Sequence, residues 1–446
     1  MIQIEARLDE LRALGLQRRT RLVSGPQGPR VVLDGRPVLV LCSDNWLGLA
    51  DHPRVREAAA EAALRWGVGA GGSRLTSGTM TIHRRAEEQL AEFLGRESAL
   101  VLGSRQAAAA STVAALARHG DVILCDAHSH PALIDGCRLS GAEMFPYDHC
   151  DMDHLEWGIE QAQGRAALVV TESLFALDGD LAPLRELTEL AQRDGLRIVV
   201  DESSAIGAIG PSGRGALADA GLEDQVDAII GSFGAALGSH GGFVACDREM
   251  ASYLLCATSE LWSATALAPP AVAGALASLR LLCDRPERVR RLSAAAMALR
   301  DAVQREGFDT GASCAQIVTC PVGDAGLASA ICDAALTAGL LIDCVRPPVV
   351  APALSRLRLT AMATHRADEL RDAARRLGAA ARSRGHRPGA VERDDTAVAS
   401  APRRLSRQAA EAVSGMRFPT TGRTAGAPSR SPRVFDHEAE PSRRAA

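Results

Sequence analysis

Two acidic side chains stand where strand-like runs end, at positions that can carry chemistry. The segment "VVTESLFALDGDLAPL" places Glu172 at the end of one apolar run, and "IVVDESSAIGAIGPSGRGA" places Asp201 at the end of another. Open α/β sheets bind ligands beyond the carboxyl ends of their strands, where a carboxylate can pair with a cationic ring nitrogen. For either acid taken alone, a helix N-cap or a loop carboxylate is the favoured interpretation.

Imidazole and guanidinium groups stand at two further places. The segment "DAHSHPALIDG" puts His128 and His130 after an apolar run, where a flat imidazole could stack on an aromatic cofactor. A lone histidine is more often structural, and two do not make a metal site, so no metal is predicted. The segment "SRLRLTAMATH" carries Arg356 and Arg358 on one face of a predicted strand. An inward arginine suits a substrate carboxylate; the alternative is a surface pair.

A glycine-rich turn joins two apolar runs in "DAIIGSFGAALGSHGGFVACD", residues 227–247. A turn of this kind usually presents a reactive side chain to a cofactor, yet its centre is Gly234-Ala235-Ala236. The chain contains no lysine, because all 50 residues counted as Lys+Arg are arginine. Mutational drift in a GC-rich genome, which turns lysine into arginine more readily than into alanine, is one explanation.

The elements that must position these side chains alternate between strand and helix. Strand-like runs separated by helical patterns fill residues 98–245, which predicts a largely parallel sheet covered by helices. The runs are SALVLG, DVILCD, AALVVTES, RIVVDES, DAIIGS and GFVACD. We expect a hairpin that turns at Asp34-Gly35 and a small C-terminal lobe with three strand candidates. Helices are expected over 2–22, near 53–66 and 80–95, within 249–307, and near 366–382.

Composition narrows the class of protein. The chain has 446 residues, of which 47% are hydrophobic, enough for a large core. The net charge of −4 argues against a nucleic-acid-binding protein, and no apolar run reaches the ~18 residues of a membrane helix. The charged N-terminus is unlike a secretory signal. The 11 cysteines show no metal-binding spacing, so we expect reduced thiols and a cytoplasmic protein.

The character of the chain changes at about Arg384. Residues 384–446 are rich in Arg, Pro, Ser and Gly and carry 12 Arg against 7 Asp+Glu, so they predict a disordered basic tail. Composition favours a solvated extension over a binding arm. An interaction protein that works through this tail is one alternative function.

Taken in chain order, the segments resemble the α-oxoamine synthase family of pyridoxal-phosphate enzymes. The resemblance covers about residues 1–382, and its spacing is most like the 8-amino-7-oxononanoate synthase branch. The matching runs are "SDNWLGL", "GAGGSRLTSGT", "VVTESLFALDGDLAPL", "GAIGPSGRGA", "IIGSFGAALGSHGGFVA" and "RPPVVAPALSRLRLTAMATH".

The resemblance implies an α/β fold of the fold-type I, aminotransferase-like kind, with a large, mostly parallel sheet domain and a small C-terminal α/β domain. It implies a homodimer that condenses an amino acid with an acyl-CoA through pyridoxal 5'-phosphate (PLP). In the family a lysine holds PLP as a Schiff base, a histidine stacks on its ring, and an aspartate keeps the ring nitrogen charged. The implied division is an N-terminal helix and hairpin (1–50), a large domain (51–275), a small domain (276–383) and the tail.

Five family positions are kept or changed conservatively. By resemblance, His130 matches the stacking histidine, Asp201 the ring-nitrogen aspartate, and Arg358 the carboxylate-binding arginine. Thr265 matches a threonine that reaches the neighbouring subunit's phosphate. Ser232 stands where the family has a phosphate-binding threonine.

Other family positions are changed. The family turn resembles GTFSKALG and this sequence reads GSFGAALG, so Ala235 occupies the position of the Schiff-base lysine. Ser204 replaces a histidine that bonds the cofactor's ring oxygen. The phosphate-side motif Ser-Gly-aromatic-Ala-Ala-Asn reads "SRQAAA" from Ser104, with Arg105 in place of the small glycine. The family's Ser-Asn-Asp-Tyr reads "SDNW" from Ser43.

These changes favour a non-catalytic family member that holds PLP non-covalently at most, as a homodimer or as the partner of an active paralogue whose pocket Thr265 would serve. One alternative is altered chemistry with PLP held by His130 and Asp201, and with His240 as candidate base. Another is a true acyl-CoA:amino-acid synthase. We disfavour it because a Schiff-base enzyme loses most of its rate without its lysine.

Overall fold

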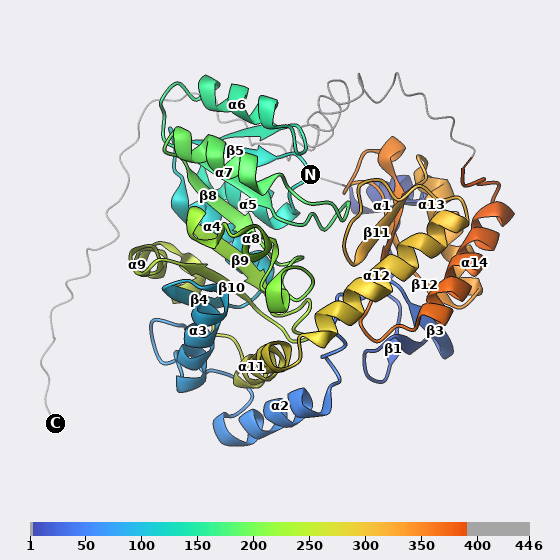
Figure 1. The fold of residues 1–446 in the computed structure, drawn as a ribbon, viewed down its shortest axis with the longest axis horizontal. Coiled ribbons are helices and arrows are strands. Elements are labelled where there is room, and N and C mark those ends of the chain that lie inside the picture. Colours follow the sequence, from blue (N-terminus) through green and yellow to red (C-terminus); the bar gives the residue numbers. More distant parts are fainter. Residues whose placement is uncertain (1–2, 390–446) are drawn as a thin grey trace, which may run out of the picture.

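A seven-stranded sheet forms the centre of the larger lobe (Figure 1). The computed structural model describes residues 3–389. The strands are β4 (Ser98–Leu102), β5 (Val122–Asp126), β6 (Glu143–Tyr147), β7 (Ala167–Glu172), β8 (Arg197–Asp201), β9 (Ala228–Ser232) and β10 (Gly242–Cys246). Their order is β4-β10-β9-β8-β7-β5-β6, and β10 runs antiparallel to both of its neighbours. The predicted, largely parallel sheet is confirmed.

Strand β6 is the element of this sheet that the sequence did not predict. It lies at the sheet edge beside β5 and reads EMFPY, with only Tyr147 fully buried. Pro146 lacks an amide hydrogen, which an edge strand tolerates because one side of it is unpaired. Without a buried apolar run, the segment carries no strand signal.

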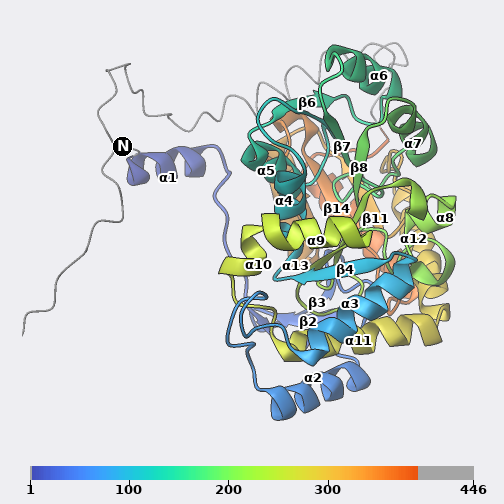
Figure 2. The same cartoon turned by 90° about the vertical axis from the view of Figure 1, so that its left-hand side faces the viewer.

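Helices cover both faces of the sheet, and a separate hydrophobic cluster lies on each face. On one face the helices are α4 (Arg105–Leu116), α5 (Pro131–Ser140), α9 (Arg248–Ala257) and α10 (Ser259–Ser263), several of which face the viewer in Figure 2. On the other face they are α3 (Thr81–Leu94), α6 (Met152–Gln161), α7 (Leu184–Arg193), α8 (Ala216–Ala220) and α11 (Pro269–Asp284). Apolar strands buried on both sides are typical of a parallel sheet.

The smaller lobe is built on a three-stranded sheet with the order β11-β14-β13. The strands are β11 (Ile317–Pro321), β13 (Asp343–Val345) and β14 (Arg356–Thr360). Its helices are α12 (Glu287–Arg305), α13 (Ala325–Thr337) and α14 (Ala367–Ser383), and α12 runs from the large lobe to the small one (Figure 1). The strand candidates and the last helix that the sequence predicted are therefore present.

The N-terminal hairpin joins the small lobe. Strands β2 (Arg30–Leu33) and β3 (Arg36–Val40) meet at Asp34 and Gly35, whose φ angles of 48° and 79° are those of the predicted two-residue turn. The two-residue strands β1 (Val23–Ser24) and β12 (Leu340–Leu341) complete this sheet, and β12 pairs in parallel with β3.

The N-terminal helices differ in how well their predicted bounds hold. Helix α1 covers only Ile4–Ala13 of the predicted 2–22 and buries no residue, and Gly15, with φ 65°, ends it. Helix α2 (Pro53–Trp66) and α3 confirm the predictions near 53–66 and 80–95.

No helix within residues 3–389 is long and apolar enough to cross a membrane. The proposed divisions at residues 50, 275 and 383 stay predictions, and the tail beyond residue 389 lies outside the described residues.

Candidate functional site

Two buried carboxylates lie side by side at the carboxyl edge of the large sheet. Glu172 ends β7, Asp201 ends β8, and the two residues are direct partners in the parallel register. Neither exposes any surface to solvent. Burial and a neighbouring like charge both disfavour the ionised carboxylate, so such a pair needs a cation.

Arg105 supplies that cation from the first turn of α4. Its Nε donates to Oδ2 of Asp201 at 2.9 Å, and its Nη2 donates to Oε2 of Glu172 at 2.9 Å. Nη2 also lies 2.8 Å from Oδ2 of Asp201. Burial alone would lower the pKa of Arg105, but the two carboxylates raise it above its ordinary value. One guanidinium therefore bridges both acids.

The start of α4 is held in place by its neighbours. Ser104 caps the helix, with its Oγ accepting from the backbone N–H of Ala107 at 3.0 Å. A Cβ on Gly242, the first residue of β10, would lie 2.3 Å from the carbonyl oxygen of Ser104. Only glycine permits this approach, so Gly242 lets the backbone beside Arg105 pack directly on β10.

The two acids differ in how well their oxygens are satisfied. Oδ1 of Asp201 accepts from the backbone N–H of Ser203 at 2.8 Å, so both oxygens of Asp201 have partners. Oε1 of Glu172 is buried without a hydrogen bond among the described residues. Burial raises the pKa of Glu172 to about 7, although Arg105 acts to lower it. Asp201 is therefore the fully bonded partner of Arg105, whereas burial favours the protonated form of Glu172.

His130 lies within the electrostatic reach of this cluster. It is the N-cap of α5, and its Nδ1 accepts from the backbone N–H of Ala132 at 3.2 Å. Burial, and then the positive charge of Arg105, lower the pKa of His130 to about 4. The charges of Asp201 and Arg358 act on the same imidazole. The charges of three other predicted site residues therefore reach His130: those of Arg105, Asp201 and Arg358.

The turn between β9 and β10 has the form that the sequence predicts. Ser232 ends β9 opposite Gly242, and its Oγ accepts from the N–H of Gly234 at 3.0 Å. Ala235 is buried within the hydrophobic cluster of its face of the sheet. His240, the candidate base, is exposed near the end of the turn.

The remaining predicted residues occupy separate surroundings. Ser204 is buried, and its carbonyl oxygen accepts from Nε2 of Gln316 at 2.8 Å. Thr265 is exposed and forms a β-bridge with Ser73. Arg358 donates from Nε to the carbonyl oxygen of Ala176 at 2.7 Å. None of these contacts tests the cofactor roles that the resemblance implies, so those roles stay predictions.

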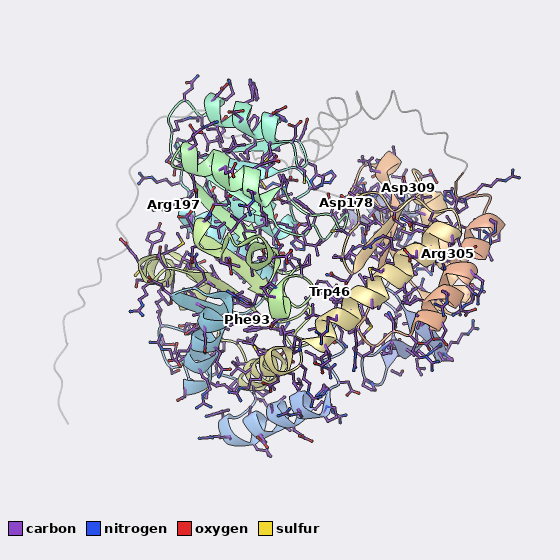
Figure 3. All side chains as sticks on the ribbon, viewed as in Figure 1. Trp46, Phe93, Asp178, Arg197, Arg305 and Asp309 are labelled. Atoms are coloured by element: carbon purple, nitrogen blue, oxygen red, sulfur yellow. The ribbon has the colours of Figure 1, made fainter. Side chains whose placement is uncertain are left out.

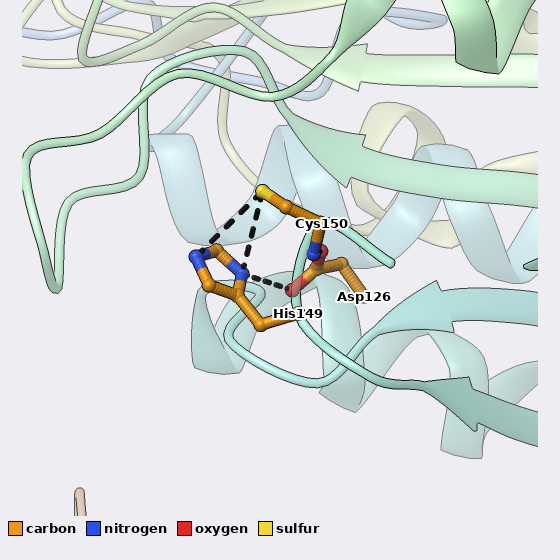
Figure 4. A group of neighbouring side chains, drawn as sticks. All are labelled: Asp126, His149 and Cys150. Atoms are coloured by element: carbon orange, nitrogen blue, oxygen red, sulfur yellow. Dashed lines mark hydrogen bonds and ion pairs between the residues drawn. The ribbon is translucent and has the colours of Figure 1, made fainter. Parts of the chain in front are cut away.

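A second charged cluster beside the site was missed by the sequence analysis (Figure 4). His149 bonds through Nδ1 to Asp126 at 2.9 Å and through Nε2 to Asp180 at 2.8 Å. Burial would lower the pKa of His149, but these hydrogen bonds raise it to about 12. Potential ligand atoms of Asp126, His149 and Cys150 lie within 4.8 Å of one another. Both ring nitrogens of His149 are engaged by carboxylates, which favours an ion cluster.

This cluster reaches the small lobe through His128 and Asp178. The rings of His128 and His149 stack with centroids 4.1 Å apart, and Nδ1 of His128 lies 2.9 Å from Oδ2 of Asp178. Arg356 of β14 pairs with the same carboxylate, and Figure 3 shows Asp178 on the side of the large lobe that faces the small one. Arg356 and Arg358 therefore reach one loop, as their alternating spacing predicts. The sequence analysis did not predict β6, and this strand brings His149 beside the ends of β5 and β7.

The sequence pattern of a known family spans most of the chain. Residues 36–377 match the family model for aminotransferase class I and II. The chain belongs to that family. The 8-amino-7-oxononanoate synthases of Geobacter sulfurreducens and Citrifermentans bemidjiense are each 42% identical over 371 residues, covering 82% of this chain and 95% of the relative.

Solved structures place the chain among the α-oxoamine synthases of this family. A lysine-to-alanine variant of serine palmitoyltransferase from S. paucimobilis, with a bound PLP–myriocin aldimine, is 30% identical, with a TM-score of 0.81 over 86% of this chain and 97% of that one. Serine palmitoyltransferase of Sphingomonas wittichii is 28% identical over the same shares, with a TM-score of 0.81. The α-oxoamine synthase resemblance and the fold-type I fold are confirmed, and PLP is the cofactor of this family.

The residues of this α-oxoamine synthase homologue do not fit PLP as the family holds it. A covalent anchor requires an amine side chain, and the sequence contains no lysine. The carboxylate of Asp201 already has both oxygens bonded within the protein. His130 and Ser232 are present, but neither replaces the missing anchor. Asp201 and Glu172 are instead both bonded to Arg105.

Proposed function

We propose that this protein is a non-catalytic α-oxoamine synthase homologue, retained as a scaffold or partner subunit, which does not condense an amino acid with an acyl-CoA. One observation carries the proposal: the turn that presents the family's lysine presents the buried Ala235, and no other lysine exists to replace it. That lysine supplies both the imine exchange and the proton transfer at the α-carbon, so its loss removes most of the rate.

The partner that we favour is an active family member, with a homodimer as the alternative. Thr265 is exposed on a segment bridged to Ser73, where the resemblance places a threonine that serves a neighbouring subunit. Two large apolar side chains are exposed on the same two segments, Leu75 at 53% and Trp262 at 51%. Tryptophan is enriched in protein–protein interfaces, so the exposed Trp262 supports a contact here. All 11 cysteines are free, which supports a cytoplasmic location.

Co-expression with an active paralogue from the same genome tests the pairing. We expect a stable heterodimer, and we expect Thr265→Ala to lower PLP occupancy at the paralogue's site. Ser263→Ala, on the same exposed segment, is the matched control and should leave occupancy unchanged. A homodimer that never captures the paralogue would exclude the partner role.

An assay of CoA release tests the non-catalytic role. The purified chain should release no CoA from any acyl-CoA when incubated with PLP and single amino acids, above the level of a protein-free blank. Turnover that depends on both substrates would overturn the proposal.

A second candidate is an enzyme that holds PLP without a covalent link. It is favoured by the S. paucimobilis relative, in which a lysine-to-alanine variant contains a PLP–myriocin aldimine. Loss of the lysine therefore does not by itself prevent such a fold from holding PLP. In this reading His240 acts as base, and His240→Ala abolishes any CoA release.

A further inference from the structure

The positive charge at the end of β8 comes from the protein itself. Asp201 is the residue that the resemblance assigns to the cofactor's ring nitrogen, and its Oδ2 accepts from the Arg105 guanidinium at 2.9 Å. The second oxygen is used by the N–H of Ser203. A cationic ring nitrogen would have to displace the guanidinium before it could reach this carboxylate.

Displacement of Arg105 is unfavourable for a second reason. The same guanidinium neutralises Glu172, which is wholly buried and is the direct neighbour of Asp201 in the sheet. If Arg105 moved out to admit a ring, the buried Glu172 would lose both a hydrogen-bond donor and a neighbouring positive charge, which is costly. If Arg105 stayed, the two cations would repel each other at close range in a site of low dielectric.

The backbone at Arg105 is fixed by the start of helix α4 and by its close packing on β10. Ser104 caps α4, and the chain at Ser104–Arg105 packs on Gly242 at a distance that admits no side chain. The side chain is mostly buried, with 19% of its surface exposed. Arg105 is thus held by its own helix start and by two carboxylates.

We propose that Arg105 is an internal replacement for the cofactor ring, and that this arginine, more than the missing lysine, closes the site to PLP. The inference deepens the proposed function and rests on it, because it names the side chain that occupies the position of the cofactor ring. Restoring the lysine alone should not restore PLP binding. Removing the guanidinium together with that change should restore it.

The experiment compares wild type, Ala235→Lys, Arg105→Gly and the double variant, with PLP itself as the probe. The first readout is the visible band of a lysine–PLP aldimine, trapped with borohydride and located by mass spectrometry on the peptide that contains residue 235. The second is the dissociation constant of PLP from equilibrium dialysis. Neither readout depends on turnover.

We expect Ala235→Lys alone to bind PLP at least ~100-fold more weakly than the double variant, the cost of separating a buried ion pair. Borohydride should label residue 235 in the double variant only. Equal affinity of Ala235→Lys and the double variant, within threefold, would overturn the inference. So would a folded double variant that fails to bind PLP.

Two further measurements keep the result interpretable. If Arg105→Gly does not fold, Arg105→Gln replaces it, because glutamine keeps most of the bulk and removes the charge. The same gain in affinity over Ala235→Lys is then expected, and its absence counts against Arg105. Turnover by wild-type protein would overturn the proposed function, whereas PLP binding by Ala235→Lys alone, as tight as by the double variant, would overturn only this inference.

Discussion

The guanidinium of Arg105 and the carboxylate of Asp201 form a buried ion pair, 2.9 Å from Nε to Oδ2, that joins the start of α4 to the end of β8. Arg105 also bonds to Glu172 of β7, which lies next to Asp201 in the sheet. These three side chains lie where an open α/β sheet ordinarily binds its ligand. Both carboxylates of this site are already bonded to a guanidinium without any ligand, which is the physical basis of the proposed loss of function.

Replacement of Arg105 by glutamine should destabilise the protein. Arg105→Gln leaves two buried carboxylates without a cation, which we expect to lower the free energy of unfolding by about 2–4 kcal/mol. Urea unfolding at pH 7.5 measures the change. The control is Arg193→Gln, which removes an exposed pair with Glu156 and should leave the midpoint unchanged. Equal midpoints for the two variants would show that the Arg105 cluster contributes little.

The same variant should raise the pKa of His130. Burial and the charge of Arg105 lower that pKa to about 4, so removal of the positive charge favours the protonated imidazole. Titration of the histidine side chains by NMR measures the shift. His365 is a matched control because burial also lowers its pKa to about 4 and the charged groups acting on it are Glu369 and Arg30. If the pKa of His130 does not move, the imidazole lies outside the reach of the Arg105 charge.

Glu202 should make the stability of the protein depend on pH. Burial raises the pKa of Glu202 to about 7 from an ordinary value of 4.5. The folded state therefore binds more protons than the unfolded state between these values, and this contribution to stability is present below about pH 4.5 and is lost as the pH rises to about 7.

Glutamine at position 202 does not titrate, so its contribution to stability does not change with pH. We expect Glu202→Gln to gain about 2–3 kcal/mol relative to wild type as the pH rises from 4.5 to 7.5. Denaturant unfolding across this range measures the difference. The control is Glu249→Gln, on the exposed surface of α9. Its free energy of unfolding should change with pH in the same way as that of wild type. Parallel curves for Glu202→Gln as well would contradict the raised pKa.

Asp178 should hold the two lobes together. It pairs with His128 of the large lobe and with Arg356 of the small lobe, and Arg356 is buried. Asp178→Asn leaves that guanidinium without its counter-ion, so we expect a loss of about 2–3 kcal/mol and faster proteolysis of the loop at 173–181. Asp333→Asn, which breaks an exposed pair with Arg21, is the control and should cleave at the wild-type rate. Unchanged proteolysis in Asp178→Asn would place the contact between the lobes elsewhere.

Local sequence patterns sufficed for the elements that rely on local signals. The Asp34-Gly35 turn, the buried strands of the large sheet and helices α2 and α3 follow directly from turn chemistry and apolar periodicity. Strand β6 could not be predicted because it is a half-exposed edge strand containing Pro146. Its absence from the prediction hid the cluster around His149.

The sequence predicted which residues belong to the candidate site, but it could not predict which of them pair with one another. The resemblance selected Arg105 and Asp201 separately, as changed and kept positions. Nothing local joins them, since they are 96 residues apart in the chain and meet only when α4 packs over the sheet. The register that sets Glu172 beside Asp201 is likewise a property of the folded sheet.

A visible absorbance titration of the wild-type protein with PLP, with and without added amino acids, would show whether the site binds the cofactor at all. We predict no aldimine band beyond that of a protein-free mixture of PLP and amino acid, because the chain has no lysine and Arg105 occupies the carboxylate that a cofactor ring would need. A band above that blank, formed only with amino acid present, would show that the site still holds an external aldimine. That result would contradict the account and favour an enzyme with non-covalently bound PLP.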